Sequence, residues 1–370
     1  MSHVTSIGLD VHARSVAACA FNPFTGEIIQ KSFGTNTEEI TSWICHFEDP
    51  KVVYESGPTG FTLCRTLRAH GIDCVVGAVS KMQKPASDRR QKNDKRDAAF
   101  LARLLATHNI VEVWVPPVEV EASRDLSRAL DDAREDLQRA RQRLSKFLLK
   151  RGHVFDEVDA LGRRKSAWTR SFWRWVEGLR PDEVAAATAF NHYVTCVRCA
   201  ESDKRALEKQ VLCEAQTQRW SPVVGALASI KGIDIISAFC LATEVGVFSR
   251  FPTARSYASW VGITPSEHSS GEKKIYGGIT KNGNSASRRT LIESAWHYIT
   301  CSPKPKPIPD GFDVSRGIKR RADDATARLV YRHKALRSAG KRTCVANTAV
   351  ARELACWVWE IGRRAEGTLS

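Results

Sequence analysis

The chain has 370 residues, with 56 Lys and Arg against 41 Asp and Glu, a formal net charge of +15 and a pI near 9.5. This length is enough for two or three domains, and the positive balance favours a polyanionic partner, nucleic acid before membrane. No apolar run reaches the roughly 18–20 residues that a membrane span needs, and the N-terminus lacks a signal-peptide pattern. We therefore expect a cytoplasmic, nucleoid-associated protein without membrane contact.

The eleven cysteines show no disulfide-framework spacing, and we expect them to be free thiols in a reducing compartment. The segment CVRC, from Cys196 to Cys199 with Cys213 following, has the one spacing that resembles a zinc site. A structural zinc ion needs four ligands, and no second Cys or His pair lies nearby in the sequence. Packing within a helix is therefore the favoured interpretation of these cysteines.

The first 110 residues alternate between short β-rich runs and helical windows. A β-meander of three strands comes first, and βα units follow it. This order is typical of a ribonuclease-H-like α/β domain, but sugar kinases and actin-like ATPases begin in the same way, so the fold alone assigns no function. The expected strands are 4–10, 16–21, 28–33, 51–56 and 73–79, and the expected helices are 37–47, 60–71 and 91–105.

The last of these helices, in QKNDKRDAAFLARLL, opens with Asp94 and Asp97, three residues apart. Aspartates in a first turn cap a helix and suit the positive end of its dipole. The same helical face continues with two leucines, however, which places both acids on the buried stripe that faces the sheet. In the ribonuclease-H-like order this helix crosses the first and fourth strands, and these strands end at Asp10 and Glu55.

Four carboxylates from three elements can thus meet at one place. Buried carboxylates without partners are costly, and divalent cations, Mg²⁺ or Mn²⁺, are their natural compensation. Two such ions can stabilise both oxygens of an in-line phosphoryl displacement. A sugar kinase would need a Gly/Thr-rich phosphate loop after Asp10, and DVHARS offers none. The pattern therefore predicts metal-dependent phosphodiester chemistry at Asp10, Glu55, Asp94 and Asp97.

Residues 123–150 predict a long, coiled-coil-like helix. Apolar residues recur there in alternating steps of four and three, as in an a/d seam, while arginines and a lysine occupy the other faces. A second long helix is expected at about 186–217. The two helices either pair antiparallel within the chain or form a dimer interface. The predicted seam consists of Leu126, Leu130, Ala133, Leu137, Ala140, Leu144 and Phe147.

Residues 224–300 predict a second compact, mainly α domain. Its segment LASIKGIDIISAFCLATEVG resembles a helix-hairpin-helix, whose turn amides grip a DNA phosphate, although Asp234 stands where the usual hairpin has a second glycine. A proline-rich linker at 303–311 and a last apolar helix follow. We therefore expect domains at 1–115, at 116–220 (the coiled-coil helices) and at 221–370.

The stretch 260–298 is rich in glycine, serine and basic residues. It predicts a flexible, phosphate-contacting loop before a helix whose start carries Arg288 and Arg289. Its glycines, Gly277, Gly278 and Gly283, are interpreted either as positions of close backbone approach to nucleic acid or as ordinary turns.

Five motifs occur in one order along the chain: GLDVH, YESGPTGF, KNDKRDA, ITPSEHSSG, and GGITKNGN followed by two arginines. In this combination the chain resembles the insertion sequence 110 family of transposases. Members of that family are DEDD-type recombinases with a RuvC-like domain and a separate serine domain. The resemblance covers nearly the whole chain, including the intervening coiled coil.

The resemblance implies a role for each site residue. Asp10, Glu55, Asp94 and Asp97 become the metal-binding acids of the RuvC-like domain. Ser270, which precedes a glycine in SSG, becomes the nucleophile that attacks a DNA phosphodiester and forms a covalent protein–DNA link. From chemistry alone Ser269 and Ser266 remain rivals. The residues that we expect to contact the nucleic acid are Lys273, Lys274, Lys281, Arg288 and Arg289.

The resemblance also implies partners. Family members use a structured bridge RNA that pairs with donor and target DNA, and they act as dimers or tetramers that combine one subunit's acids with another subunit's serine. His12 and His268 lie beside the motifs, and either is open as a general base, although histidines near strand ends usually are not. The sequence thus predicts an RNA-guided DNA transposase or recombinase. Two alternatives remain open: a RuvC-type nuclease, such as a junction resolvase, without covalent intermediate, and a non-enzymatic nucleic-acid-binding protein.

Overall fold

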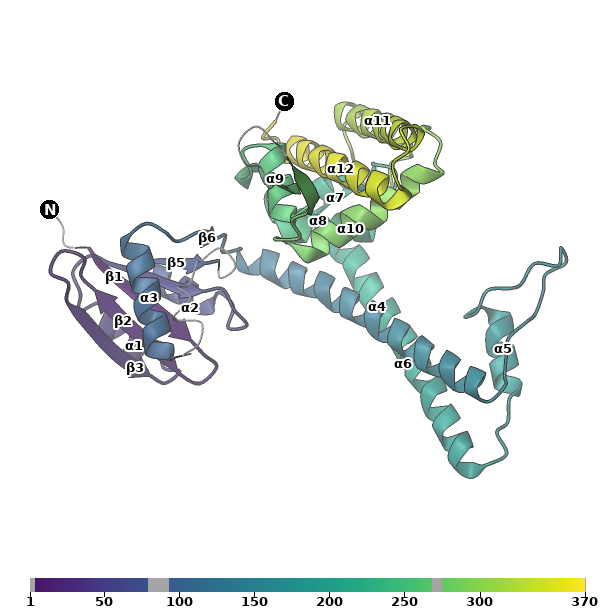
Figure 1. Cartoon of the computed structure of the whole chain (residues 1–370), viewed down its shortest axis with the longest axis horizontal. Helices are drawn as coiled ribbons and strands as arrows, with labels where there is room; N and C mark the ends of the chain where they lie inside the picture. The colour runs from purple at the N-terminus through teal and green to yellow at the C-terminus, as the bar shows by residue number, and fades with distance from the viewer. Residues whose placement is uncertain (1–3, 79–92, 268–274, 370) are drawn as a thin grey trace. The chain divides into compact units, whose positions relative to one another are not determined.

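The computed structural model describes residues 4–78, 93–267 and 275–369. The chain forms two compact units, Met1–Pro117 and Val118–Ser370, and each is described here by itself (Figure 1). The first unit is α/β and the second is mainly helical. The predicted division into three domains stays a prediction. No helix of the described ranges combines the length and the apolar character that a membrane crossing requires.

The first unit contains a six-stranded mixed sheet with the order β3-β2-β1-β4-β5-β6. β1, β2 and β3 form the expected antiparallel meander, β4 and β5 continue parallel to β1, and β6 closes the edge antiparallel to β5. This topology is consistent with a ribonuclease-H-like domain, as the sequence predicted. The strands are β1 (Thr5–Val11), β2 (Val16–Phe21), β3 (Ile28–Phe33), β4 (Pro50–Glu55), β5 (Asp73–Gly77) and β6 (Glu112–Val113).

Helices cover both faces of this sheet. Inward-facing residues of β1 and β4, such as Ile7 and Tyr54, form one core cluster with α1 (Thr37–Ile44) and α2 (Thr62–Ala69). On the opposite face Ala17 and Cys19 of β2 pack against α3 (Asp94–Ala106), which Figure 1 shows lying across the sheet. Alternate residues of β1 and β2 therefore face two different layers of helices.

The helix α3 lies directly on the backbone of β1 at Gly8. A Cβ atom at Gly8 would be 2.1 Å from the carbonyl oxygen of Ala98 and 2.6 Å from the amide nitrogen of Ala102. Both alanines are fully buried. Only a residue without a side chain permits this approach, so Gly8 sets the distance between the helix and the strand.

In the second unit two long helices, α4 (Val118–Lys150) and α6 (Val184–Ala215), run antiparallel. Ser123 of α4 donates a hydrogen bond to Glu214 at 2.9 Å, and Phe147 stacks on Phe190 with ring centroids 6.2 Å apart. The sequence left a dimer interface open as well; the structure shows pairing within the chain. A short helix that was not predicted, α5 (Arg170–Gly178), adds an aromatic cluster beside these helices, with Phe172 at its centre.

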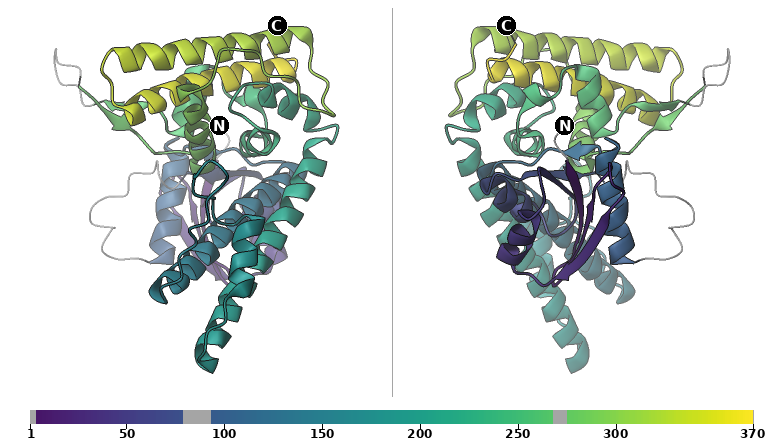
Figure 2. Two further views of the ribbon diagram at one scale, coloured as in Figure 1. Left: turned by 90° about the vertical axis from the view of Figure 1, so that its right-hand side faces the viewer. Right: turned by 90° about the vertical axis from the view of Figure 1, so that its left-hand side faces the viewer.

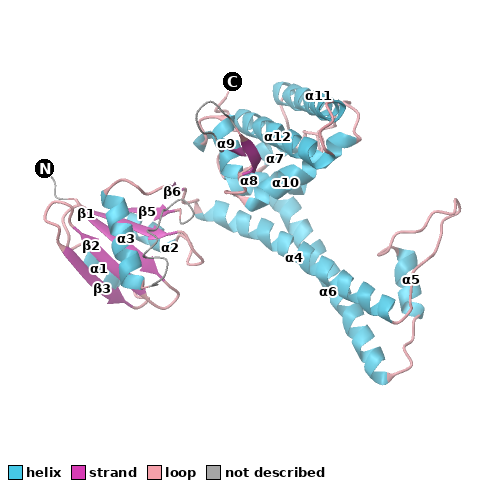
Figure 3. Cartoon of the chain, in the orientation of Figure 1, coloured by secondary structure: helices cyan, strands magenta, loops and turns pink. Residues whose placement is uncertain are grey.

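The remainder of the second unit is a cluster of helices with a small two-stranded sheet (Figures 2 and 3). The last two helices lie side by side, and Arg328 of α11 donates to Glu353 of α12 at 2.7 Å. The sheet lies in a stretch that the sequence predicted to be a flexible loop. The elements are α7 (Ser221–Ala228), α8 (Ile235–Val245), α9 (Ala254–Val261), β7 (Pro265–Glu267), β8 (Tyr276–Ile279), α10 (Ser285–Trp296), α11 (Arg316–Ser338) and α12 (Thr343–Ala365), with single 3₁₀ turns at Phe248–Arg250 and His297–Ile299.

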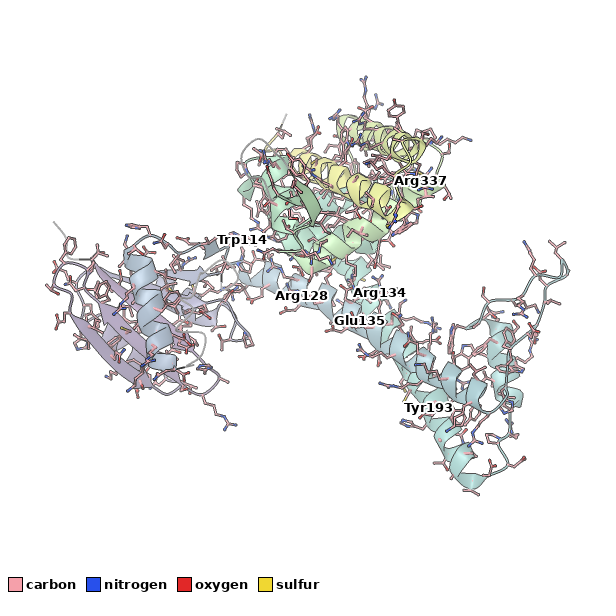
Figure 4. All side chains as sticks on the ribbon, in the orientation of Figure 1. Trp114, Arg128, Arg134, Glu135, Tyr193 and Arg337 are labelled. Carbon is pink, nitrogen blue, oxygen red and sulfur yellow. The ribbon has the colours of Figure 1, made fainter. Side chains whose placement is uncertain are left out.

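A buried carboxylate joins α4 to these helices. Glu244, at the end of α8, has a side chain that is 1% exposed and accepts two hydrogen bonds from Arg128 of α4, at 2.7 and 3.0 Å. Asn284 caps α10 through its Oδ1 and donates from its Nδ2 to the same carboxylate at 2.6 Å. Figure 4 shows Arg128 on α4, together with Arg134 and Glu135 further along that helix. These bonds satisfy the buried charge, as its position requires.

The predicted helix-hairpin-helix corresponds to α7, α8 and the turn between them, where Gly232 has a φ of +90°. The chain's own residues surround this turn. Lys306, from the proline-rich segment, donates to the carbonyl oxygens of Ala228 and Ile233, and Asp234 caps α8 by accepting from the Ser237 amide. The Asp234 carboxylate thus occupies the start of α8, where the sequence predicted a DNA phosphate. Binding of a DNA phosphate by this turn stays a prediction.

We predict that Gly8→Ala destabilises the first unit by roughly 1–3 kcal/mol, because α3 must move away from β1 to admit the methyl group. Urea unfolding followed by circular dichroism measures this as a lower midpoint. Gly34→Ala is the matched control, since a Cβ there would meet no atom within 4 Å. A Gly8→Ala protein as stable as the control would mean that α3 does not rest on β1 in this way.

Candidate active site

Asp10 and Glu55 lie next to each other at the ends of two parallel strands. β1 and β4 are paired in register up to Leu9 and Tyr54, and the two acids are the residues that follow. Leu9 and Tyr54 point into the core beside α1 and α2. Because side chains alternate along a strand, Asp10 and Glu55 point to the opposite face, where α3 lies.

The start of α3 brings two further acids to the edge of this face. Asp97 is half-buried, but Asp94 is exposed, so the prediction that both acids lie on the buried stripe is wrong for Asp94, which lies at the open first turn of the helix. Asn93 is the N-cap residue and accepts from the Lys95 amide, so capping is not the task of Asp94 or Asp97, which occupy the first turn. The contact of Ala98 with Gly8 fixes where this turn lies relative to β1. The positions of Asp94 and Asp97 relative to the Ala98–Gly8 contact then follow from the geometry of the α-helix.

The electrostatics of Asp10 reflect these neighbours. Burial is the largest cause and raises the pKa of the Asp10 carboxyl. His12 acts in the opposite direction, whereas the negative charges of Asp94 and Asp97 raise the same pKa further. The structure therefore brings Asp10 into the electrostatic range of both acids of α3, and it places Glu55 beside Asp10 through the sheet register.

His12 lies within the acidic cluster. Its Nε2 atom is 3.3 Å from Oδ2 of Asp10 and 3.5 Å from Oδ1 of Asp94. The candidate ligand atoms of these three residues all lie within 4.8 Å of one another, which makes them, within the described ranges, the one group of His, Cys, Asp and Glu that can hold a metal ion. From the sequence, His12 was interpreted only as a candidate general base. Its position two residues after Asp10 places it on the same side of the chain, and this spacing was the signal that it belongs to the acidic cluster.

The donor set of this cluster fits a divalent cation. Carboxylate oxygens are the ligands that Mg²⁺ and Mn²⁺ prefer, and an imidazole nitrogen is a common ligand of Mn²⁺ and heavier ions. Oδ2 of Asp10 and Nε2 of His12 are buried atoms that make no hydrogen bond within the part of the chain that the structure describes. An acidic group with buried, unsatisfied donor atoms suggests divalent metal binding, without deciding which ion binds.

The candidate serine site lies largely outside the described residues. This applies to Ser269, Ser270, His268, Lys273 and Lys274. Ser266 lies in β7, and a Cβ at Gly277 of β8 would be 2.5 Å from its Oγ. The β7–β8 pair, which brackets the undescribed stretch in the sequence, is antiparallel and pairs Pro265 with Ile279 and Glu267 with Tyr276.

The basic residues expected to contact nucleic acid have different surroundings. Arg288 donates to the carbonyl oxygen of Val261 at 2.9 Å, and Arg289 forms an ion pair with Asp131 of α4. Both guanidinium groups are thus engaged within the chain, while Lys281 follows β8 at a φ of +55° and is exposed. Contact of these residues with nucleic acid stays a prediction.

Comparison with known families agrees with the two-part organisation. A transposase model for the DEDD domain of the IS110 group matches residues 7–151, and the model described as the IS116/IS110/IS902 transposase family matches residues 224–307. The first match contains Asp10, Glu55, Asp94 and Asp97, and the second contains β7, β8 and the stretch between them.

Relatives extend this likeness over the whole chain. The protein named "Putative transposase y4qE" of Sinorhizobium fredii is 35% identical over 374 residues, which cover 98% of this chain and 90% of the relative. The transposase for insertion sequence element IS1533 of Leptospira borgpetersenii is 30% identical, covering 80% of this chain and 86% of the relative. The transposase for IS1328 of Yersinia enterocolitica is 23% identical over 81% and 85%. Identity at this level over nearly complete chains, together with both family models, shows that this chain belongs to the IS110 family of transposases.

Proposed function

We propose that this transposase is an RNA-guided DNA recombinase that cuts and rejoins DNA through a serine nucleophile assisted by metal ions. Asp10, Glu55, Asp94 and Asp97 would hold the ions. The observation that carries the proposal is the group formed by Asp10, His12 and Asp94, whose candidate ligand atoms lie within 4.8 Å of one another. Glu55 follows the strand residue paired with Leu9, and the charge of Asp97 acts on Asp10, but neither of these two acids belongs to that group.

The acidic cluster has a definite task in this proposal. When bound, divalent ions supply the positive charge that stabilises the attacking and leaving oxygens of a phosphodiester displacement. Asp10 and Glu55 are anchored on the rigid sheet, and Asp94 and Asp97 on a helix that is seated on Gly8. Sites built on strands and helices hold their ligands more precisely than sites on loops. His12 is within reach of the same ion as Asp10 and Asp94.

Ser270 is the proposed nucleophile, on the strength of the family pattern around SSG. Its hydroxyl loses a proton as Oγ forms a bond to phosphorus, one P–O bond of the DNA strand breaks, and the sugar oxygen leaves as a free hydroxyl. A serine hydroxyl is a weak nucleophile at neutral pH, so the removal of its proton has to be assisted. Since the acids and Ser270 belong to different compact units, the reaction requires the two units to meet, within one chain or between two.

The proposed partners are donor DNA, target DNA and a structured bridge RNA, with a homodimer or homotetramer as the active form. The net charge of +15 supports polyanionic partners. Base pairing by the RNA would select the sites, so the protein need read little sequence itself. A RuvC-type nuclease without a covalent intermediate is the alternative, but the match of residues 224–307 to a transposase family favours a reaction that uses this second part.

A first test concerns the metal site through stability. Burial raises the pKa of Asp10 above its unfolded value, so the stability that its proton contributes is present below that unfolded value and is lost as the pH rises through the folded pKa. Ionised Asp10 thus destabilises the metal-free fold at pH 7. We expect Asp10→Asn to unfold at a higher temperature than the wild type in EDTA at pH 7, with the difference shrinking toward pH 3.

Magnesium should reverse this order. It should raise the unfolding temperature of the wild type by mass action but leave that of Asp10→Asn unchanged. Glu112→Gln, which removes an exposed acid of the same unit, is the matched control and should respond to magnesium as the wild type does. Equal stabilisation of all three proteins by magnesium would remove Asp10 from the metal site.

A second test concerns the nucleophile. The full-length protein is incubated with its guide RNA, donor DNA and magnesium, and covalent protein–DNA adducts are separated on denaturing gels. Ser270→Ala should abolish the adduct and retain RNA binding, whereas Glu55→Gln should lose DNA cleavage and retain DNA affinity. An adduct that survives in Ser270→Ala but disappears in Ser269→Ala would reassign the nucleophile, and cleavage without any adduct would favour the plain nuclease.

A further inference from the structure

A cavity of about 830 Å³ lies in the second unit between the β7–β8 sheet and the helices α11 and α12. Figure 3 shows this small sheet as the short strands among the helices. The volume is within the range of pockets that hold small molecules or single nucleotides. Its walls are mostly apolar and include Ile263, Pro265, Ile279, Val345, Ala349 and Cys356.

The rim of the cavity is positively charged. Lys281, Arg332 and Arg352 border it, against one acid, Glu353. Arg328 donates to Glu353 at 2.7 Å, whereas Arg332 is 3.7 Å from the same carboxylate. Lys281 and Arg352 form no ion pair with any residue that the structure describes. An apolar cavity with cations at its entrance fits a ligand that is flat and apolar at one end and anionic at the other.

Among the glycines of β8 and the following turn, Gly278 is the one that supports a ligand site. Gly283 has a φ of +155°, and a Cβ there would be 2.1 Å from the carbonyl oxygen of Trp260; a Cβ at Gly277 would press on Ser266. The fold itself therefore requires a glycine at 283, whereas at 277 the Ser266 hydroxyl can turn away from an added methyl group. Gly278 also lines the cavity, yet a Cβ at this position would meet no atom within 4 Å. The described fold therefore does not require a glycine at 278, and the absence of a side chain leaves this wall open to a ligand.

We propose that this cavity binds one unstacked nucleotide of a DNA strand, with its base against the apolar walls and its phosphate at Arg352 and Lys281. A base within a duplex is stacked on both sides and cannot enter a cavity of this size, so the ligand is an unpaired or flipped-out nucleotide. Arginine is suited to phosphate because its guanidinium group offers two parallel donors. The choice of DNA rests on the proposed function, since β7 and β8 bracket the sequence that contains Ser270.

Cysteines of the chain provide a direct readout. Cys344 lines the cavity and is exposed, while Cys45 and Cys213 are exposed and lie elsewhere. Full-length Ser270→Ala protein, which the proposed function expects to form no adduct, is alkylated with iodoacetamide with and without a single-stranded DNA 12-mer, and each cysteine is quantified by mass spectrometry. We expect the DNA to slow alkylation of Cys344 about tenfold, with little effect on Cys45 and Cys213, and an equal concentration of duplex to protect much less.

Two variants test the assignment of the cavity. Ala349→Phe fills it from α12, and Arg352→Glu reverses a rim charge on the surface, where folding is not at risk. Each should weaken the DNA affinity measured by protection of Cys344 by about tenfold, the order of loss expected when the buried apolar contact of one base or one charge-assisted phosphate contact is removed. Arg320→Glu, at an exposed arginine of α11 outside the cavity, is the matched control and should leave protection unchanged relative to its parent.

The outcomes separate this inference from the proposed function. Protection of Cys344 in Ser270→Ala supports the cavity even if no adduct is ever found with the wild type. Alkylation of Cys344 at the same rate with and without the 12-mer would overturn the inference, as would protection that both Ala349→Phe and Arg352→Glu retain. Stronger protection by an RNA 12-mer of the same sequence would overturn the assignment to DNA.

Discussion

The seat of α3 on Gly8 is the constraint on which the acidic site depends. The side chains of a strand usually separate its backbone from a helix that packs on it. Here two alanines of α3 approach the strand backbone to distances that exclude even a methyl group at position 8. The first turn of the helix is therefore held close to Asp10, and its two aspartates act on that carboxyl through space. Burial raises the pKa of Asp10 most, and the two aspartates that this helix contact brings near raise it further.

The second unit has a comparable fixed point at Glu244. Its buried carboxylate receives Arg128 of α4 and Asn284 at the start of α10, so that a long helix and the segment after β8 share one charged centre. Removing a partner of Glu244 destabilises the junction, because the carboxylate charge stays buried with fewer donors around it. Arg288 and Arg289 lie within two turns of Asn284, and their internal contacts with Val261 and Asp131 belong to the same junction. The junction orients the region that the transposase family model covers.

Local patterns predicted much of this architecture. Alternation and turn residues located the meander and the parallel strands, and the a/d spacing located two long helices that do pair antiparallel. Since parallel strands end at one edge, Asp10 and Glu55 could be placed together from the sequence. The importance of Gly8 could not be predicted, because its partners, Ala98 and Ala102, come from a distant helix. For the same reason the ion pair of Arg289 with Asp131 and the contact of His12 with Asp94 became visible only in three dimensions, whereas the spacing of His12 from Asp10 could be read from the sequence.

The division of the chain at Pro117 has a consequence for the host cell. Under the proposed function the acids belong to one unit and the nucleophilic hydroxyl to the other, so neither unit alone would carry the complete reaction. DNA cleavage would then require an assembled complex that brings the acids and the serine hydroxyl close together. On that proposal, a transposase whose catalytic groups are divided between two units would cut little DNA before its complex is complete, which would protect the genome that carries the element.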